Sequence, residues 1–237
     1  MSQKRTEEIT CPKCGAKGPF TVWDSVNVED SPSLRGQLMD ESIFVWTCPD
    51  CGHTVYVTFS TLYHDSTNQF LLFFDHKTGD KDIEDSPFPD GEAFEQFNKT
   101  YRLRFVHGIN NLKEKIFIFE EGLNDIVIEL LKYFIRNGII AIQQGDGEEK
   151  GQPIPGNYFI GRAIYFTQMS ADGEQLIFSI ARPRGGVESH FALSMDLYSQ
   201  CLQKLALDKR FKEDRNSIKN VCYEWVEARL KTPVEES

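Results

Sequence analysis

Two matching pairs of cysteines are the residues of this chain best suited to chemistry. Cys11 and Cys14 form one C-P-x-C-G segment, and Cys48 and Cys51 form the other, with 33 residues between Cys14 and Cys48. Two intervening residues let both sulfurs of a pair turn back onto one ion, and four thiolates complete a closed tetrahedral zinc site. The doubled pattern therefore predicts one zinc ion bound by all four cysteines.

The residues around each pair are suited to shaping the turn that holds the metal. Each first cysteine is followed by a proline, which pre-sets φ. Each second cysteine is followed by a glycine, which can adopt a positive φ and lead the chain away from the ion. The predicted turn-shaping residues are Pro12, Gly15, Pro49, Gly52 and the neighbouring His53.

Other kinds of site use the same C-x-x-C spacing. A thioredoxin-like dithiol stands at a helix N-terminus, but Cys51 is followed by Gly52 and the alternating, strand-like segment HTVYVTF. A rubredoxin-type iron site uses the same two turns and remains an alternative, because sulfur ligands alone do not separate zinc from iron.

A catalytic zinc ion needs an open coordination position, which four thiolates do not leave. His53 and His64 could exchange with a cysteine, but we expect neither to be a ligand. Cys201 and Cys222 each lie on an apolar helical stripe and are predicted to pack rather than react.

Motifs of other active sites are absent from the sequence. It contains no phosphate-binding loop, calcium loop or G-x-S-x-G turn. We therefore predict no catalytic residues and no enzyme, and keep an unrecognised site in the C-terminal half as the alternative.

Composition and charge indicate where the protein is located and which partners it favours. The 237 residues include 18 Phe and are 40% hydrophobic, without a run long enough to span a membrane or an apolar secretory signal. These features favour a cytoplasmic protein. The net charge of −10 disfavours nucleic acid and favours a protein partner. Nucleic-acid binding would require clustering of Lys4, Arg5, Lys13, Lys17 and Arg35.

Hydrophobic periodicity predicts the elements that must position the cysteines. Strands are expected around both pairs, at 19–28, 42–47, 53–59 and 68–74, with a helix at 31–40 that has Ser31 as N-cap and Pro32 at its first position. We expect a small antiparallel β unit closed by the metal at one end.

The C-terminal half of the chain is predicted to contain both helices and strands. Helices are expected at 109–119 and 125–137, a strand at 139–144, and a β-meander over 158–168, 175–181 and 189–194, followed by two closing helices. The predicted fold class is α+β. The predicted domains are a zinc-ribbon-like β domain at 1–75, an acidic linker or long loop at 76–93, and an α+β domain at 94–237.

The cysteine segments, together with VWDSVNV, LYHD and EKIFIFEEGL, resemble the CpXC family of bacterial and archaeal proteins over residues 10–135. The resemblance implies metal binding through the four cysteines and implies no particular activity. The LYHD segment adds His64 and Asp65 as a candidate functional surface.

The function expected from the sequence is that of a structural zinc protein, a non-catalytic interaction module with a protein partner. Nucleic-acid binding, an iron protein and an enzyme are the alternatives, in that order. Neither the partner nor the oligomeric state follows from the sequence.

Overall fold

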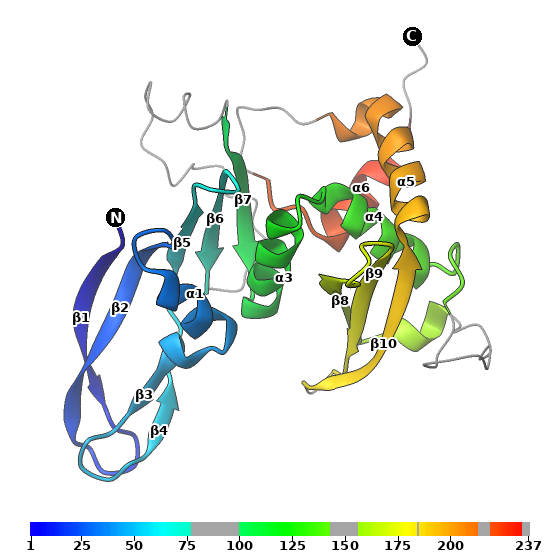
Figure 1. The fold of residues 1–237 in the computed structure, drawn as a ribbon. Coiled ribbons are helices and arrows are strands. Elements are labelled where there is room, and N and C mark those ends of the chain that lie inside the picture. Colours follow the sequence, from blue (N-terminus) through cyan, green and yellow to red (C-terminus); the bar gives the residue numbers. More distant parts are fainter. Residues whose placement is uncertain (77–99, 143–155, 184, 213–218, 234–237) are drawn as a thin grey trace. The chain divides into compact units, whose positions relative to one another are not determined.

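The chain has an α+β fold, as predicted (Figure 1). The computed structural model describes residues 1–76, 100–142, 156–183, 185–212 and 219–233. These residues form two compact units. The first lies within Met1–Lys113 and takes in Lys219 and Asn220, and the second lies within Glu114–Asp214 and Val221–Ser237.

A five-stranded sheet in the order β1-β2-β5-β6-β7 is the framework of the first unit. Its strands are β1 (Gln3–Thr10), β2 (Lys17–Asn27), β5 (Thr61–Asp65), β6 (Phe70–Asp75) and β7 (Arg102–His107). The predicted antiparallel arrangement is correct for β1–β2 and β5–β6, but β5 joins β2 in parallel and β7 joins β6 in parallel. Parallel pairing is possible because a long crossover connects β2 to β5.

The crossover carries the second cysteine pair. It contains α1 (Pro32–Met39), the 3-10 turn η1 (Ser42–Phe44), and the hairpin strands β3 (Val45–Thr47) and β4 (Thr54–Tyr56). The predicted helix with Pro32 at its start is confirmed. The predicted strand at 42–47 begins only at Val45, because Glu41 adopts a left-handed φ of 66° and starts the 3-10 turn.

Aromatic side chains fill the core of the first unit. The Phe44 ring lies 4.9 Å from that of Phe59 and 6.1 Å from that of Phe74, and the Tyr63 ring stacks on Phe70 at 5.8 Å. β7 comes from residues predicted to belong to the second domain. The predicted linker lies outside the described residues, except for His76.

Helix α3 (Ile109–Glu120) contributes to both units, and the other elements of the second unit follow it. The helices are α4 (Asp125–Arg136), α5 (Met195–Leu207) and α6 (Tyr223–Lys231), with 3-10 turns η2 (Gly156–Phe159) and η3 (Lys209–Phe211). The strands β8 (Ala163–Met169), β9 (Gln175–Ala181) and β10 (Val187–Ser194) form the predicted antiparallel meander, but β8 begins at Ala163 and not at 158, because η2 occupies Gly156–Phe159.

The C-terminus of α4 explains why the predicted strand at 139–144 is wrong. Gly138, at a φ of 69°, donates its N–H to the Ile135 carbonyl, and Ile139 donates to the Phe134 carbonyl. These two bonds close a Schellman motif. Residues 139–142 therefore form bends and loop, and residues 143 and 144 lie outside the described part of the chain.

Helix α4 is buried almost all round and organises the second unit. The Asn124 side chain caps it by accepting from the N–H groups of Ile126 and Val127. Ile126 and Leu130 pack in one cluster with Phe211, Val221 and Val226. Among the described residues, no helix combines the length and apolar character that crossing a bilayer requires.

Candidate metal centre

The two cysteine pairs occupy two turns of the same design. The first joins β1 to β2, and the second joins β3 to β4. In the first, Gly15 donates its N–H to the Cys11 carbonyl at 2.9 Å, and Cys11 donates to the Ala16 carbonyl at 2.8 Å. In the second, Gly52 donates to the Cys48 carbonyl at 3.0 Å, and Cys48 donates to the His53 carbonyl at 2.8 Å. Identical bonding at equivalent positions gives both turns the same shape.

The glycines have the backbone conformation that the sequence required of them. Gly15 has a φ of 77° and Gly52 a φ of 67°, both in the left-handed region that side chains with a Cβ rarely adopt. Each turn therefore reverses directly after its second cysteine, and the next residue re-enters a hydrogen bond with the first cysteine.

The four sulfurs converge as metal ligands do. Cys11 Sγ lies 3.6 Å from Cys51 Sγ, and Cys14 Sγ lies 3.6 Å from Cys48 Sγ. All four sulfurs lie within 4.8 Å of one another. Regular tetrahedral coordination at a Zn–S distance of 2.3 Å puts sulfurs about 3.8 Å apart. The donor set and spacing therefore fit a tetrahedral ion bound between the two turns.

The backbone of the first turn favours the thiolate form of Cys11. Cys11 and Cys48, the first residues of each pair, are each 1% exposed. Burial opposes ionisation of Cys11, but the backbone N–H groups of Cys14 and Lys13 outweigh it and lower the pKa of this thiol to about 7. The N–H groups of a turn thus stabilise the charge that a metal would neutralise.

A tryptophan ties the two turns to the same scaffold. Trp46 on β3 is buried, and its indole N–H donates to the Pro19 carbonyl on β2 at 3.2 Å. A Cβ added to Gly18 would approach the Trp46 ring to 3.0 Å, so the glycine allows this close contact. β3 is therefore held against β2 next to the cysteines.

The predicted neighbours of the site have different roles. Within the described residues, the four cysteines are the one group of three or more side chains that could hold a metal ion, and it includes neither His53 nor His64. His53 contributes its backbone carbonyl to the second turn. Cys201 on α5 and Cys222 before α6 are half-buried, and burial raises the pKa of both thiols.

His64 and Asp65, the candidate functional surface, lie on β5 of the first unit. Asp65 is 3% exposed, and its two carboxylate oxygens accept from the backbone N–H and the side-chain amide of Asn68, both at 2.8 Å. It therefore shapes the turn between β5 and β6. The half-buried His64 ring lies 3.2 Å from the Asn27 amide and 3.4 Å from the Tyr101 hydroxyl. Burial, assisted by the N-terminal ammonium, lowers the pKa of His64.

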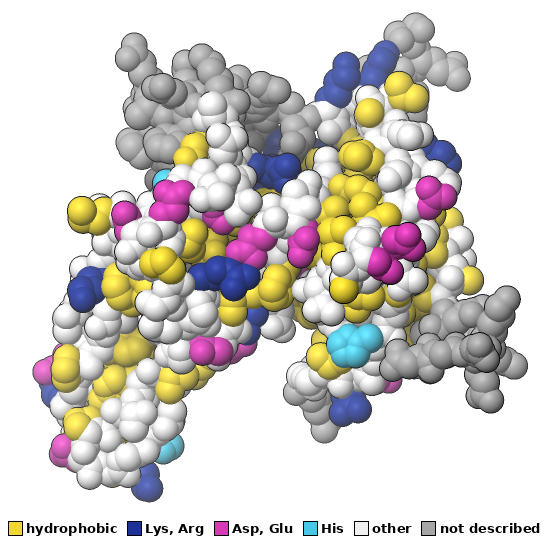
Figure 2. Space-filling view, in the orientation of Figure 1, with side chains coloured by type: hydrophobic (Ala, Val, Ile, Leu, Met, Phe, Trp, Pro, Cys, Tyr) yellow, Lys and Arg dark blue, Asp and Glu magenta, His cyan; other side chains and the backbone are white. Residues whose placement is uncertain are grey.

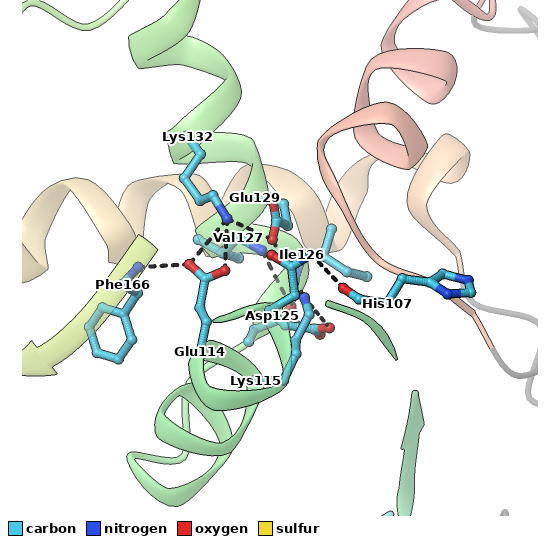
Figure 3. Close-up of polar contacts among 11 residues, drawn as sticks. His107, Glu114, Lys115, Asp125, Ile126, Val127, Glu129, Lys132 and Phe166 are labelled. Carbon is cyan, nitrogen blue, oxygen red and sulfur yellow. Dashed lines mark hydrogen bonds and ion pairs between the residues drawn. The ribbon is translucent and has the colours of Figure 1, made fainter. Parts of the chain in front are cut away.

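A second polar site, which the sequence analysis did not find, lies inside the second unit (Figure 3). Lys132 on α4 donates to both carboxylate oxygens of Glu114 at 2.9 and 3.1 Å, and to Glu129 at 3.0 Å. Glu114 also accepts the backbone N–H of Phe166 on β8 at 2.7 Å. One buried carboxylate thus connects α3, α4 and the sheet.

A second lysine completes this buried ion network. Lys115 lies 3.0 Å from Asp125 and 3.6 Å from Glu129. The five side chains are only 1–8% exposed, so the network is closed to a substrate. Asp125, Glu129 and Lys132 follow an i, i+4, i+7 spacing on an otherwise apolar helix, and this spacing is the signal that could have revealed them.

Three carboxylates and two ammonium groups leave this network with one excess negative charge. Burial raises the pKa of Glu114, against the opposing attraction of Lys132. Burial also disfavours the charged form of Lys132, but Glu114 and Glu129 outweigh it and hold the pKa of this lysine above its ordinary value. Lys132 therefore stays charged, and Glu114 takes up a proton more readily than an ordinary exposed glutamate.

Comparison with known families agrees with the geometry of the cysteines. A family profile described as "CpXC protein" matches residues 9–132, which is more than half of the chain and includes both turns. The chain belongs to the CpXC family. No curated protein and no solved structure matches it. The CpXC match and the four-sulfur cluster together indicate metal binding.

Proposed function

We propose that this CpXC protein is a non-catalytic interaction module held together by one structural zinc ion. The ion joins the β1–β2 and β3–β4 hairpins, which together are called the ribbon. The observation that carries the proposal is the convergence of four thiols, all within 4.8 Å, from two turns of the same design. Four thiolates fill a tetrahedral coordination sphere and leave no position for a substrate. Zinc is preferred to iron because the site needs only a redox-inert ion that closes the two hairpins.

Metal content of the purified full-length protein tests the first part of this proposal. Elemental analysis is expected to give one zinc ion per chain for the native protein. Cys48→Ser is expected to lose that ion, whereas Cys201→Ser, outside the cluster, is the matched control and is expected to keep it. Iron with visible absorption, or a protein without metal after preparation with equimolar zinc, would contradict the proposal.

Two exposed apolar side chains on the ribbon support a protein partner. Val45 on β3 and Tyr56 on β4 are directly opposite each other and are 41% and 46% exposed. The Tyr56 hydroxyl donates to Glu41 at 2.9 Å, and its ring lies 5.7 Å from that of Phe44. A tyrosine held in a fixed orientation beside an aliphatic side chain is suited to contact an apolar protein surface.

Substitution of Val45 tests this surface. Val45→Glu should abolish the capture of proteins that the wild type retains from its native host, while leaving the metal content unchanged. Leu207→Glu is the matched control, because Leu207 is 86% exposed on α5 of the other unit. Equal capture by the wild type and both variants would argue against a partner at this hairpin.

The charges on the ribbon give less support to nucleic-acid binding. Arg5 is paired with Glu7 and Asp24, and Lys17 lies 2.7 Å from Glu8. These carboxylates offset the basic residues that a phosphate backbone would need. A cytoplasmic location belongs to the same proposal, because a reducing compartment keeps the four cysteines available as thiolates.

A further inference from the structure

Strand β1 forms one edge of the sheet in the first unit (Figure 1). Its inner edge pairs with β2 from Gln3 to Thr10, and no other strand in the described part of the chain pairs with its outer edge. All of its residues but Ile9 are exposed. An exposed strand edge presents unpaired N–H and C=O groups that another strand can extend.

The charges of β1 change sign at Thr6. The strand reads QKRTEEIT, so two basic residues, Lys4 and Arg5, precede Thr6 and two acidic residues, Glu7 and Glu8, follow it. In Figure 2, basic and acidic side chains both line the margin where β1 lies. Reversing the direction of such a strand puts its acidic half opposite its basic half.

The geometry of a two-fold axis restricts how two copies of β1 can pair. An axis perpendicular to the sheet keeps each face on its own side, so opposed residues must point to the same face of the sheet. Successive residues alternate between the two faces, so opposed residues must be an even number of positions apart in the sequence. The two-fold axis must therefore pass beside one residue, which lies opposite its own copy. Centring on Arg5 opposes two arginines, and centring on Glu7 opposes two glutamates.

Centring on Thr6 pairs every charge with its opposite. Lys4 then faces Glu8 of the second copy on one face of the sheet, and Arg5 faces Glu7 of the second copy on the other. Opposite charges directly across a strand pair stabilise it, and like charges destabilise it. We propose that β1 pairs antiparallel with β1 of a second copy of this chain, about a two-fold axis through Thr6.

The contacts that these residues make within one chain do not prevent this pairing. Arg5 and Glu7 are 50% and 47% exposed, and Glu8 with its partner Lys17 are 63% and 62% exposed. Ion pairs at such exposed positions are weak and exchange readily. Lys4 lies 5.4 Å above the Trp23 ring, which leaves its ammonium at the surface. The pairing joins only seven residues of each strand, Gln3 to Ile9. We therefore expect a reversible dimer that dissociates on dilution.

Complementary charge reversal tests the proposal in the full-length, metal-loaded protein under reducing conditions. Lys4→Glu/Arg5→Glu makes the four charged positions acidic, and Glu7→Lys/Glu8→Arg makes them basic. Either variant alone should self-associate at least about tenfold more weakly than the wild type, because all four symmetry-related pairs become repulsive. An equimolar mixture of the two should restore a dimer, since every opposed pair is then complementary.

Sedimentation equilibrium up to about 1 mM protein measures self-association of the wild type, of each variant and of their mixture. Lys204→Glu/Lys231→Glu is the control for total charge, because both double Lys/Arg→Glu variants change the net charge from −10 to −14. This control should dimerise as the wild type does. A wild type that stays monomeric over the whole range, reversed variants that still self-associate, or a mixture that does not associate would each overturn the proposal. The dimer is independent of zinc and of a partner at Val45, so its failure leaves the proposed function standing.

Discussion

The two units of this CpXC protein stabilise charged side chains in different ways. The first gathers four cysteines at the ends of two hairpins, one of which has strands of only three residues. The second buries five charged side chains among helices and a sheet and pairs them with one another. A hairpin with three-residue strands buries little apolar surface, so the proposed metal would stabilise it, whereas the larger core of the second unit can enclose an ion network. If the proposed metal is bound, one unit depends on that ion and the other on internal ion pairs.

Loss of the metal should have the largest effect on stability, and this effect should be confined to the first unit. Structural zinc contributes about 10–16 kcal/mol of binding free energy in zinc-finger peptides, and the proposed ion would couple in the same way to folding of the two hairpins. Chelation or Cys48→Ser should remove hydrogen-exchange protection from β3 and β4 and leave protection of β8–β10 unchanged. Cys201→Ser is the control, and unchanged protection of β3 and β4 after chelation would show that the ribbon does not need the metal.

Removing Lys132 should have the converse effect. Lys132→Met leaves Glu114 and Glu129 buried without their shared ammonium group, at a cost of about 3–5 kcal/mol to the second unit. Hydrogen exchange should increase in β8–β10 and remain unchanged in the ribbon. Lys204→Met on the exposed side of α5 should change stability by less than about 0.5 kcal/mol. Similar values for the two variants would show that the network is not important for stability.

Asp65 should contribute to the stability of the first unit independently of the metal. Asp65→Ala removes two hydrogen bonds to Asn68 and should lower the free energy of unfolding of the first unit by about 1–3 kcal/mol. Asp65→Asn retains an accepting oxygen and should cost less. If Asp65→Ala retains full stability by denaturant titration, the role of Asp65 as a turn residue is wrong.

The smallest effect is a pH dependence of the second unit. Folded Glu114 keeps its proton at pH values at which the unfolded chain, with an ordinary pKa of 4.5, has lost it. Its contribution to stability is therefore greatest at low pH and is lost as the pH rises above 4.5 through the folded pKa. Relative to Glu114→Gln, the wild type should lose stability with rising pH by at most about 1.4 kcal/mol per pH unit. A stability difference that stays constant, or changes in favour of the wild type, would contradict the raised pKa.

The metal site could be predicted from the sequence because its determinants are local. The segments from Cys11 to Ala16 and from Cys48 to His53 each close a complete turn within six residues, with hydrogen bonds made inside the segment. The α+β class and most elements also followed from local periodicity. The parallel pairing of β2 with β5 did not, because strand partners depend on contacts between distant segments.

The buried ion network escaped prediction for a related reason. Glu114, Asp125 and Lys132 resemble ordinary surface residues when each is considered alone, and charged side chains are rarely buried without partners. Their burial follows from the packing of α3 and α4 with β8, which sequence periodicity does not describe. The i, i+4, i+7 spacing on α4 becomes informative only when the opposite face of the helix is also known to be apolar.

The crossover between β2 and β5 has a consequence for the order of folding. The 33 residues between Asn27 and Thr61 must close as a loop before these parallel strands can pair. Loop closure becomes less favourable as the loop lengthens. A metal that joins the two cysteine turns would bring the chain back beside the start of β2 at Cys51, nine residues before β5 begins, although β5 pairs with the far end of β2 at Ser25–Asn27. Such an ion would shorten the chain that must still be ordered before β5 reaches β2, so it should accelerate the formation of the central sheet as well as stabilise the two hairpins.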